Sequence, residues 1–123
     1  DDHLVVGAAG ETDDNAFNYD KGAVYVFSKN NGVWNRTHKL RASDGVGGGA
    51  GSVTGGDYFG RSVALFGSTL AVGAEKNNGT GAVYIFELSN GNWVEKQKLL
   101  AANGTNNDFF GTTVAMFQNT LVV

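Results

Sequence analysis

The sequence predicts an all-β protein built from repeated four-stranded antiparallel sheets. Its nineteen glycines gather mostly at turns, Val, Phe, Tyr and Thr fill the runs between them, and one series of these runs recurs along the 123 residues. With 41% hydrophobic residues, the chain can bury one modest core and is too short for two domains of usual size. We therefore expect one domain or part of one.

The most complete copy of the repeat lies at residues 57–100. Its first two strands are predicted at Phe59 to Phe66 and at Thr69 to Ala74. The connection Gly67-Ser68 has glycine in the first central position, which suits a two-residue type II′ hairpin. The third strand is predicted at Gly81 to Phe86, after a polar loop.

The pair Asn90-Gly91 then predicts a tight hairpin into a fourth strand, Trp93 to Leu99. The first strand is apolar at nearly every position, whereas the fourth alternates polar and apolar residues. We therefore expect burial to fall from the first strand to the fourth.

Partial copies flank this unit. The segment Leu4 to Ala8 repeats Leu70 to Ala74, and Leu121 to Val123 begins it again. Gly22 to Phe27 repeats the third strand, and Phe110 to Phe117 is predicted as another first strand. With the strands of a unit numbered one to four, the predicted order is 2-3-4, 1-2-3-4, 1-2.

This order divides the chain into a partial unit at 1–42, a linker loop at 43–56, a complete unit at 57–100 and a partial unit at 109–123. The loops Ala9 to Lys21 and Asp44 to Gly56 are longer than their counterparts in the other copies, so we expect them to lie at the surface. Because the first and last units lack strands, we expect residues 1–123 to be a piece of a longer array that associates when isolated.

Short dipeptides carry a resemblance to a known family. The dipeptides are Phe59-Gly60 with Gly73-Ala74, and partial copies of them at Gly7-Ala8 and Phe110-Gly111. The chain resembles FG-GAP repeat proteins, whose repeats form the blades of the integrin alpha-chain N-terminal β-propeller. The resemblance implies a propeller fragment of about two four-stranded blades. The chain departs from the family where Ala9 and Glu75 stand, since proline usually follows the Gly-Ala pair there.

Composition excludes several classes of partner. Nine basic and twelve acidic residues give a net charge of −3 without a cluster of Lys or Arg, which argues against nucleic acid. The chain has no cysteine, so disulfides and thiolate zinc sites are excluded. No apolar run in the segment approaches the roughly 20 residues that span a bilayer.

The resemblance implies calcium in many relatives, in a loop between the first and second strands. Here these connections are Gly67-Ser68 and Gln118-Asn119, which offer no carboxylate. No cofactor is therefore predicted. The remaining cation candidates lie in the first long loop, where a solvated acidic loop is the favoured interpretation. The weak metal candidates are Asp13, Asp14 and Asp20; together with Glu11 and Asp44 they are also weak ligand-binding candidates.

Catalytic motifs are absent from the sequence. No Gly-x-Ser-x-Gly elbow occurs, and neither His3 nor His38 stands in a ligand-like spacing. Paired carboxylates for glycoside hydrolysis remain an alternative for Asp57 and Asp108, which recur just before a first strand. We favour a structural role for both, in which they accept hydrogen bonds from backbone N–H groups at the strand start.

Trp34 and Trp93 occupy matching positions at the start of a fourth strand. Exposed tryptophans would suit sugar stacking, but residues that repeat in register favour packing between neighbouring blades. Three N-glycosylation sequons begin at Asn35, Asn78 and Asn103; in a eukaryote with a secretory route they would agree with an extracellular location.

The expected function is a non-enzymatic interaction or adhesion module, extracellular or at the cell surface, that binds protein or glycan through its inter-strand loops. The remaining propeller blades of a longer chain are expected as further partners. The alternatives are an architectural repeat scaffold in a large surface protein and, least favoured, a carbohydrate-active enzyme domain.

Overall fold

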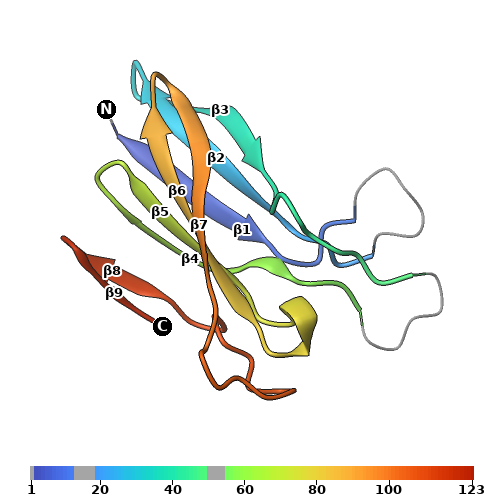
Figure 1. Ribbon diagram of the computed structural model, residues 1–123. Helices are drawn as coiled ribbons and strands as arrows, with labels where there is room; N and C mark the ends of the chain where they lie inside the picture. The colour runs from blue at the N-terminus through green and yellow to red at the C-terminus, as the bar shows by residue number, and fades with distance from the viewer. Residues whose placement is uncertain (1, 13–18, 50–54) are drawn as a thin grey trace.

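The computed structural model describes residues 2–12, 19–49 and 55–123. Within them, three antiparallel sheets follow one another along the chain (Figure 1). The first sheet has the order β1-β2-β3 and comprises β1 (His3–Ala8), β2 (Ala23–Asn30) and β3 (Val33–Leu40). The second has the order β4-β5-β6-β7 and comprises β4 (Phe59–Phe66), β5 (Thr69–Ala74), β6 (Ala82–Ser89) and β7 (Asn92–Leu99).

The third sheet is a hairpin of β8 (Ala115–Phe117) and β9 (Thr120–Val122). One short 3-10 helix, η1 (Asn77–Gly79), lies between β5 and β6. The predicted all-β class and the predicted strand order 2-3-4, 1-2-3-4, 1-2 are confirmed. The described residues include no apolar helix of membrane-spanning length.

Tight hairpins lie at one end of the sheets and the longer connections at the other (Figure 1). Asn90 and Gly91 have φ of 50° and 80°, the positive pair that a type I′ turn requires. The equivalent turn in the first sheet, Asn31-Gly32, has φ of 50° and 81°. The predicted hairpin at Gly67-Ser68 joins Phe66 to Thr69 directly, with φ of 57° at Gly67.

The predicted first strand Phe110 to Phe117 is wrong in length, because β8 covers only Ala115–Phe117. In the observed register the hairpin pairs Ala115 with Val122, Met116 with Leu121 and Phe117 with Thr120. Phe110 instead forms a parallel bridge to Gly81 of the preceding repeat.

The expected gradient of burial is also wrong. In β5 every residue from Leu70 to Ala74 is buried, whereas in β4 only Phe59 and Gly60 are. The reason is position in the sheet: β4 is an edge strand, and β5 lies between β4 and β6 with a neighbouring sheet over each face.

The sheets pack face to face in a repeating way. One face of the second sheet, here called face A, carries Leu70, Val72 and Tyr84 and shares a core with Val24 and Val26 of the first sheet. The opposite face, face B, carries Ala71 and Val83 and shares a core with Val114 and, from the third sheet, Met116 and Leu121. Face A of each sheet therefore packs on face B of the sheet before it.

The two matching tryptophans differ in burial, because only one of them lies between two described sheets. Trp93 is 6% exposed in the core between the first and second sheets, and its ring meets that of His3 edge-on at 5.9 Å. Trp34 occupies the same position on face A of the first sheet and is 41% exposed. The packing expected for both residues is therefore found for Trp93 and not for Trp34, because no other described sheet covers face A of the first sheet.

Candidate ligand site at the loop end

Glycine contacts hold successive sheets at a fixed distance. A Cβ on Gly7 of β1 would lie 2.0 Å from the carbonyl oxygen of Gly60 in β4. In the next repeat, a Cβ on Gly73 would lie 1.9 Å from the carbonyl oxygen of Gly111. The glycines of the Phe-Gly and Gly-Ala dipeptides therefore meet each other across the boundary between sheets, where backbone approaches too closely for a side chain.

A second pair of backbone contacts fixes the positions of the loops between successive repeats. Gly22 bridges Phe59, and Gly81 bridges Phe110, each in a parallel sense. Both glycines have positive φ, 83° and 95°, and a Cβ on either would lie about 2 Å from the phenylalanine carbonyl oxygen. The loop before each third strand is thereby fixed against the loop before the next first strand.

Asp57 and Asp108 organise these loops. Asp57 is buried, and its Oδ2 accepts hydrogen bonds from the Val46 N–H at 2.8 Å and the Asn77 amide at 2.8 Å. Asp108 accepts from the N–H of Thr105 at 2.7 Å and from its hydroxyl at 2.9 Å, and these hydrogen bonds lower the pKa of Asp108. Both carboxylates bond backbone N–H groups as expected, although the donors belong to the preceding loop and not to the strand.

The two long loops contact each other. Tyr19 and Gly48 exchange two backbone hydrogen bonds, of 3.0 and 2.7 Å. The hydroxyl of Tyr58 donates to Asp20 at 2.9 Å, which raises the pKa of the tyrosine. Asp20 is therefore part of the contact between repeats.

The other acidic candidates are also held by the sheets. Glu11 accepts hydrogen bonds from the Tyr25 hydroxyl and from Arg41, at 2.9 Å for the latter, and pairs with Lys39. Burial opposes its ionisation, but the hydrogen bonds from Lys39 and Tyr25 outweigh burial and lower the pKa of Glu11.

The second sheet holds the Asp44 carboxylate in the way that the first sheet holds the Glu11 carboxylate. Lys98 at 2.6 Å and the Tyr84 hydroxyl at 2.7 Å donate to its two oxygens and lower its pKa. Burial, and then the bond to Asp44, raises the pKa of Tyr84. Tyr25 and Lys39 are partners on neighbouring strands of the first sheet, and Tyr84 and Lys98 are partners in the same way in the second. Each repeat therefore presents the same pair of carboxylate-binding side chains.

These acidic groups do not converge. Among the described residues, no three His, Asp or Glu side chains come together in a way that could hold a metal ion. Asp13 and Asp14 lie outside the described residues. Glu11, Asp20 and Asp44 each have a separate partner set, as described above.

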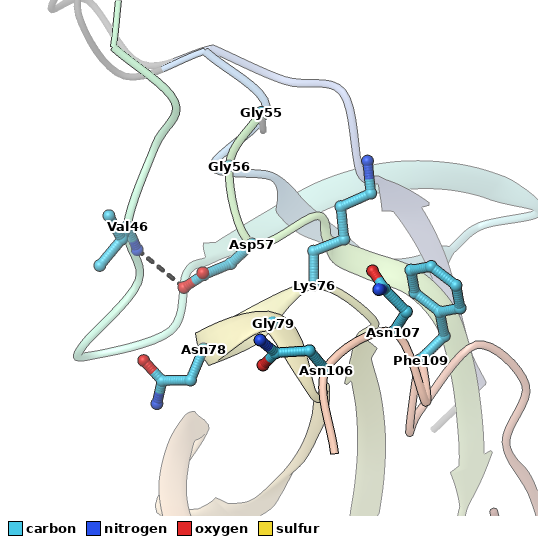
Figure 2. A pocket seen from close by; sticks show the side chains of 10 residues that line it. All are labelled: Val46, Gly55, Gly56, Asp57, Lys76, Asn78, Gly79, Asn106, Asn107 and Phe109. Atoms are coloured by element: carbon cyan, nitrogen blue, oxygen red, sulfur yellow. Dashed lines mark hydrogen bonds between the residues drawn. The ribbon is translucent and has the colours of Figure 1, made fainter. Parts of the chain in front are cut away.

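The candidate site is a pocket of about 660 Å³ at the loop end, where loops of successive repeats meet. Figure 2 shows the Asp57 carboxylate turned toward Val46, while the Lys76 side chain extends in a different direction. The Lys76 ammonium lies 4.5 Å from the centre of the Tyr58 ring. The lining is completed by glycines, three asparagines and one phenylalanine: Gly55, Gly56, Gly79, Asn78, Asn106, Asn107 and Phe109.

Apart from Asp57, the polar side chains of this pocket have few partners in the fold. Within the described part of the chain, the amides of Asn78, Asn106 and Asn107 make no side-chain hydrogen bond, and Lys76 has no carboxylate partner. Phe109 is 40% exposed with φ of 53°, and its counterpart Tyr58 has φ of 57°. These residues were not predicted from the sequence as ligand-binding residues; the pairs Asn77-Asn78 and Asn106-Asn107, in two different loops, were the signal available.

The three sequon asparagines lie at the surface. Asn35 is exposed on β3, Asn78 on η1 and Asn103 in the loop before the third sheet. Asn78 also lines the loop-end pocket.

Successive antiparallel sheets, packed face A on face B and joined by glycine contacts, define a β-propeller-type repeat module. The chain belongs to the FG-GAP repeat family, since the sequence model of the FG-GAP repeat matches residues 34–86 and 93–123. A search of curated proteins gave no match.

Proposed function

We propose that this FG-GAP chain is a non-enzymatic interaction module, extracellular or at the cell surface, that binds a protein or a glycan at its loop end. One observation carries the proposal. The pocket between successive repeats is lined by the Lys76 ammonium, three amides and an exposed phenyl ring. Within the described residues the amides make no side-chain hydrogen bond, and the ammonium has the Tyr58 ring as its partner and no carboxylate. In ligand pockets a few convergent polar groups orient and select the ligand.

The remaining features agree with this role. FG-GAP repeats are in general non-enzymatic modules, and the pocket's one carboxylate, Asp57, is committed to Val46 and Asn77. The exposed sequon asparagines agree with a secreted or surface chain.

The test compares variants of the two ends of the sheets. The full chain is displayed on beads and assayed against glycan arrays and cell-surface protein extracts. Combined Lys76→Gln, Asn106→Ala and Asn107→Ala should abolish binding, whereas Asn92→Ala with Lys96→Gln, on exposed positions of β7, should leave it unchanged. Binding that survives the first set of substitutions would contradict a loop-end site.

A second candidate, an architectural repeat, is favoured by face A of the first sheet. Leu4 and Val6 are 43% and 44% exposed there, and their counterparts Leu70 and Val72 are fully buried against the preceding sheet. Trp34 and Trp93 differ in the same way. Another blade of the same kind, offering its face B, is the partner that this surface fits.

Association of residues 1–123 tests the second candidate. Multi-angle light scattering should show concentration-dependent oligomers, and Leu4→Lys with Val6→Lys should reduce them. Val94→Lys is the matched control, because Val94 is exposed to a similar extent on β7. A monomer at all concentrations would rule out face A as a docking surface between blades.

A further inference from the structure

We infer that the loop-end pocket binds an acidic glycan, with a uronate carboxylate at Lys76, a sugar ring against Phe109 and hydroxyl groups at the asparagine amides. The inference rests on the proposed function, because it names the ligand class of the same pocket.

Although the chain carries −3, the lining of the pocket includes one cationic group, Lys76, that no carboxylate of the described residues pairs with. Lys76 and Asp57 are the ionisable residues among the lining. The Asp57 carboxylate accepts two hydrogen bonds at 2.8 Å from protein groups and is turned away from Lys76 (Figure 2). Lys76 has the Tyr58 ring beneath it at 4.5 Å and no carboxylate partner within the described residues. It is therefore available to an anionic ligand group.

The neutral lining suits hydroxyl groups. Each asparagine amide offers two N–H donors and a carbonyl acceptor, which match a ligand rich in O–H groups that donate and accept at once. Asn78, Asn106 and Asn107 supply three such amides on one pocket. Phe109 adds an apolar surface on which the C–H face of a sugar ring can pack.

A protein ligand fits the pocket less well. Protein interfaces are centred on a cluster of buried apolar and aromatic side chains. Here the apolar side chains of the lining are Phe109 and Val46 alone. The volume of about 660 Å³ lies in the range of small-ligand sites, roughly 300–1,000 Å³.

The hairpin end offers a weaker glycan site. A hollow of about 420 Å³ contains Trp34 there, beside Asp2 and Phe66. The ammonium of Lys29 lies 5.5 Å from the centre of the Trp34 ring, so one face of this tryptophan is already occupied.

Three saccharide probes test the inference on the ¹⁵N-labelled full chain by NMR titration. Trigalacturonate is the acidic probe, its methyl ester is the neutral match of the same shape, and maltotriose is an unrelated neutral sugar. Trigalacturonate should bind more than tenfold tighter than the ester and shift the amides of Lys76, Asn106 and Phe109. Equal affinity for ester and acid would overturn the acidic class.

Two variants locate the contacts. Lys76→Gln should weaken trigalacturonate about tenfold, as expected for a lost charge-assisted hydrogen bond, and should remove the preference over the ester. Phe109→Asn should weaken all saccharides, and asparagine tolerates the left-handed backbone at this position. Lys96→Gln is the charge-matched control on β7 and should change nothing.

The outcomes separate this inference from the proposed function. If no probe binds at millimolar concentration while the loop-end variants still lose a protein partner, the glycan inference is overturned and the interaction module stands. If neither saccharides nor extracts respond to the loop-end substitutions, both are overturned.

Discussion

Gly73 of β5 faces the carbonyl oxygen of Gly111 so closely that a Cβ on Gly73 would lie 1.9 Å from that oxygen. Gly7 and Gly60 are related in the same way at the preceding boundary, at 2.0 Å. The dipeptides that mark the repeat in the sequence are thus the two sides of one contact between sheets.

The first prediction tests this contact. Gly73→Ala should lower the free energy of unfolding by about 1–3 kcal/mol, because the added methyl group overpacks a backbone contact. Gly49→Ala is the control, since a Cβ there meets nothing within 4 Å. Gly60→Val should cost at least as much as Gly73→Ala, because Gly60 has φ of 92° and its Cβ would lie 2.5 Å from the Ala23 oxygen. Denaturant unfolding measures all three, and a neutral Gly73→Ala would contradict the contact.

The second prediction compares the tryptophans. Trp93→Ala should destabilise the chain by about 3–5 kcal/mol, because it empties part of the core between the first and second sheets. Trp34→Ala should cost less than about 1 kcal/mol, because Trp34 is largely exposed and lies outside that core. Equal losses in thermal or denaturant unfolding would show that Trp34 is covered in solution.

The third prediction concerns acid. Lys98 and Tyr84 hold the pKa of Asp44 below its ordinary value, so the ionised carboxylate stabilises the folded state above the unfolded pKa of about 3.9. This contribution is lost as the pH falls through the lower, folded pKa. Asp44→Asn should therefore lower the melting temperature at about pH 7, and this difference should shrink as the pH falls below about 3.9.

Lys98→Gln, alone and combined with Asp44→Asn, completes a double-mutant cycle for this ion pair. The double variant should melt close to either single variant at neutral pH, since one interaction is removed in all three. Additive losses would show that Asp44 and Lys98 act independently.

The fourth prediction is that calcium contributes little to folding. The connection between β4 and β5 is only Gly67-Ser68, which leaves no backbone to surround a cation. Thermal melts with millimolar calcium and with excess chelator should superimpose. A rise of several degrees with calcium would indicate a site in the first long loop, where Asp13 and Asp14 stand.

The strands and their order were predictable because turns and apolar runs are local. Asn90-Gly91 fixes a type I′ turn by itself, and β4 and β5 begin and end at the predicted residues. Burial was not predictable, because it depends on which sheets lie above and below. Trp34 and Trp93 have the same local sequence setting and differ only in their neighbours.

The candidate site was less predictable for the same reason. Acidic residues were the predicted ligand-binding residues, yet the carboxylates of Glu11 and Asp44 accept hydrogen bonds from tyrosine and lysine side chains far along the chain. The pocket brings together Lys76, in the loop between β5 and β6, and Asn106 and Phe109, in the loop before the third sheet. These residues meet only because the second and third sheets are in contact. Spacing along the sequence does not reveal that meeting.

The link between Val46 and Asp57 has a consequence for engineering. The Asp57 N–H donates to the Val46 carbonyl at 2.9 Å, and the Asp57 carboxylate accepts from the Val46 N–H, so the two ends of this connection are clamped together. Lengthening a closed loop twofold costs only about 0.6 kcal/mol of chain entropy. Lengthening the connection between Val46 and Asp57 should therefore leave the stability of the sheets nearly unchanged.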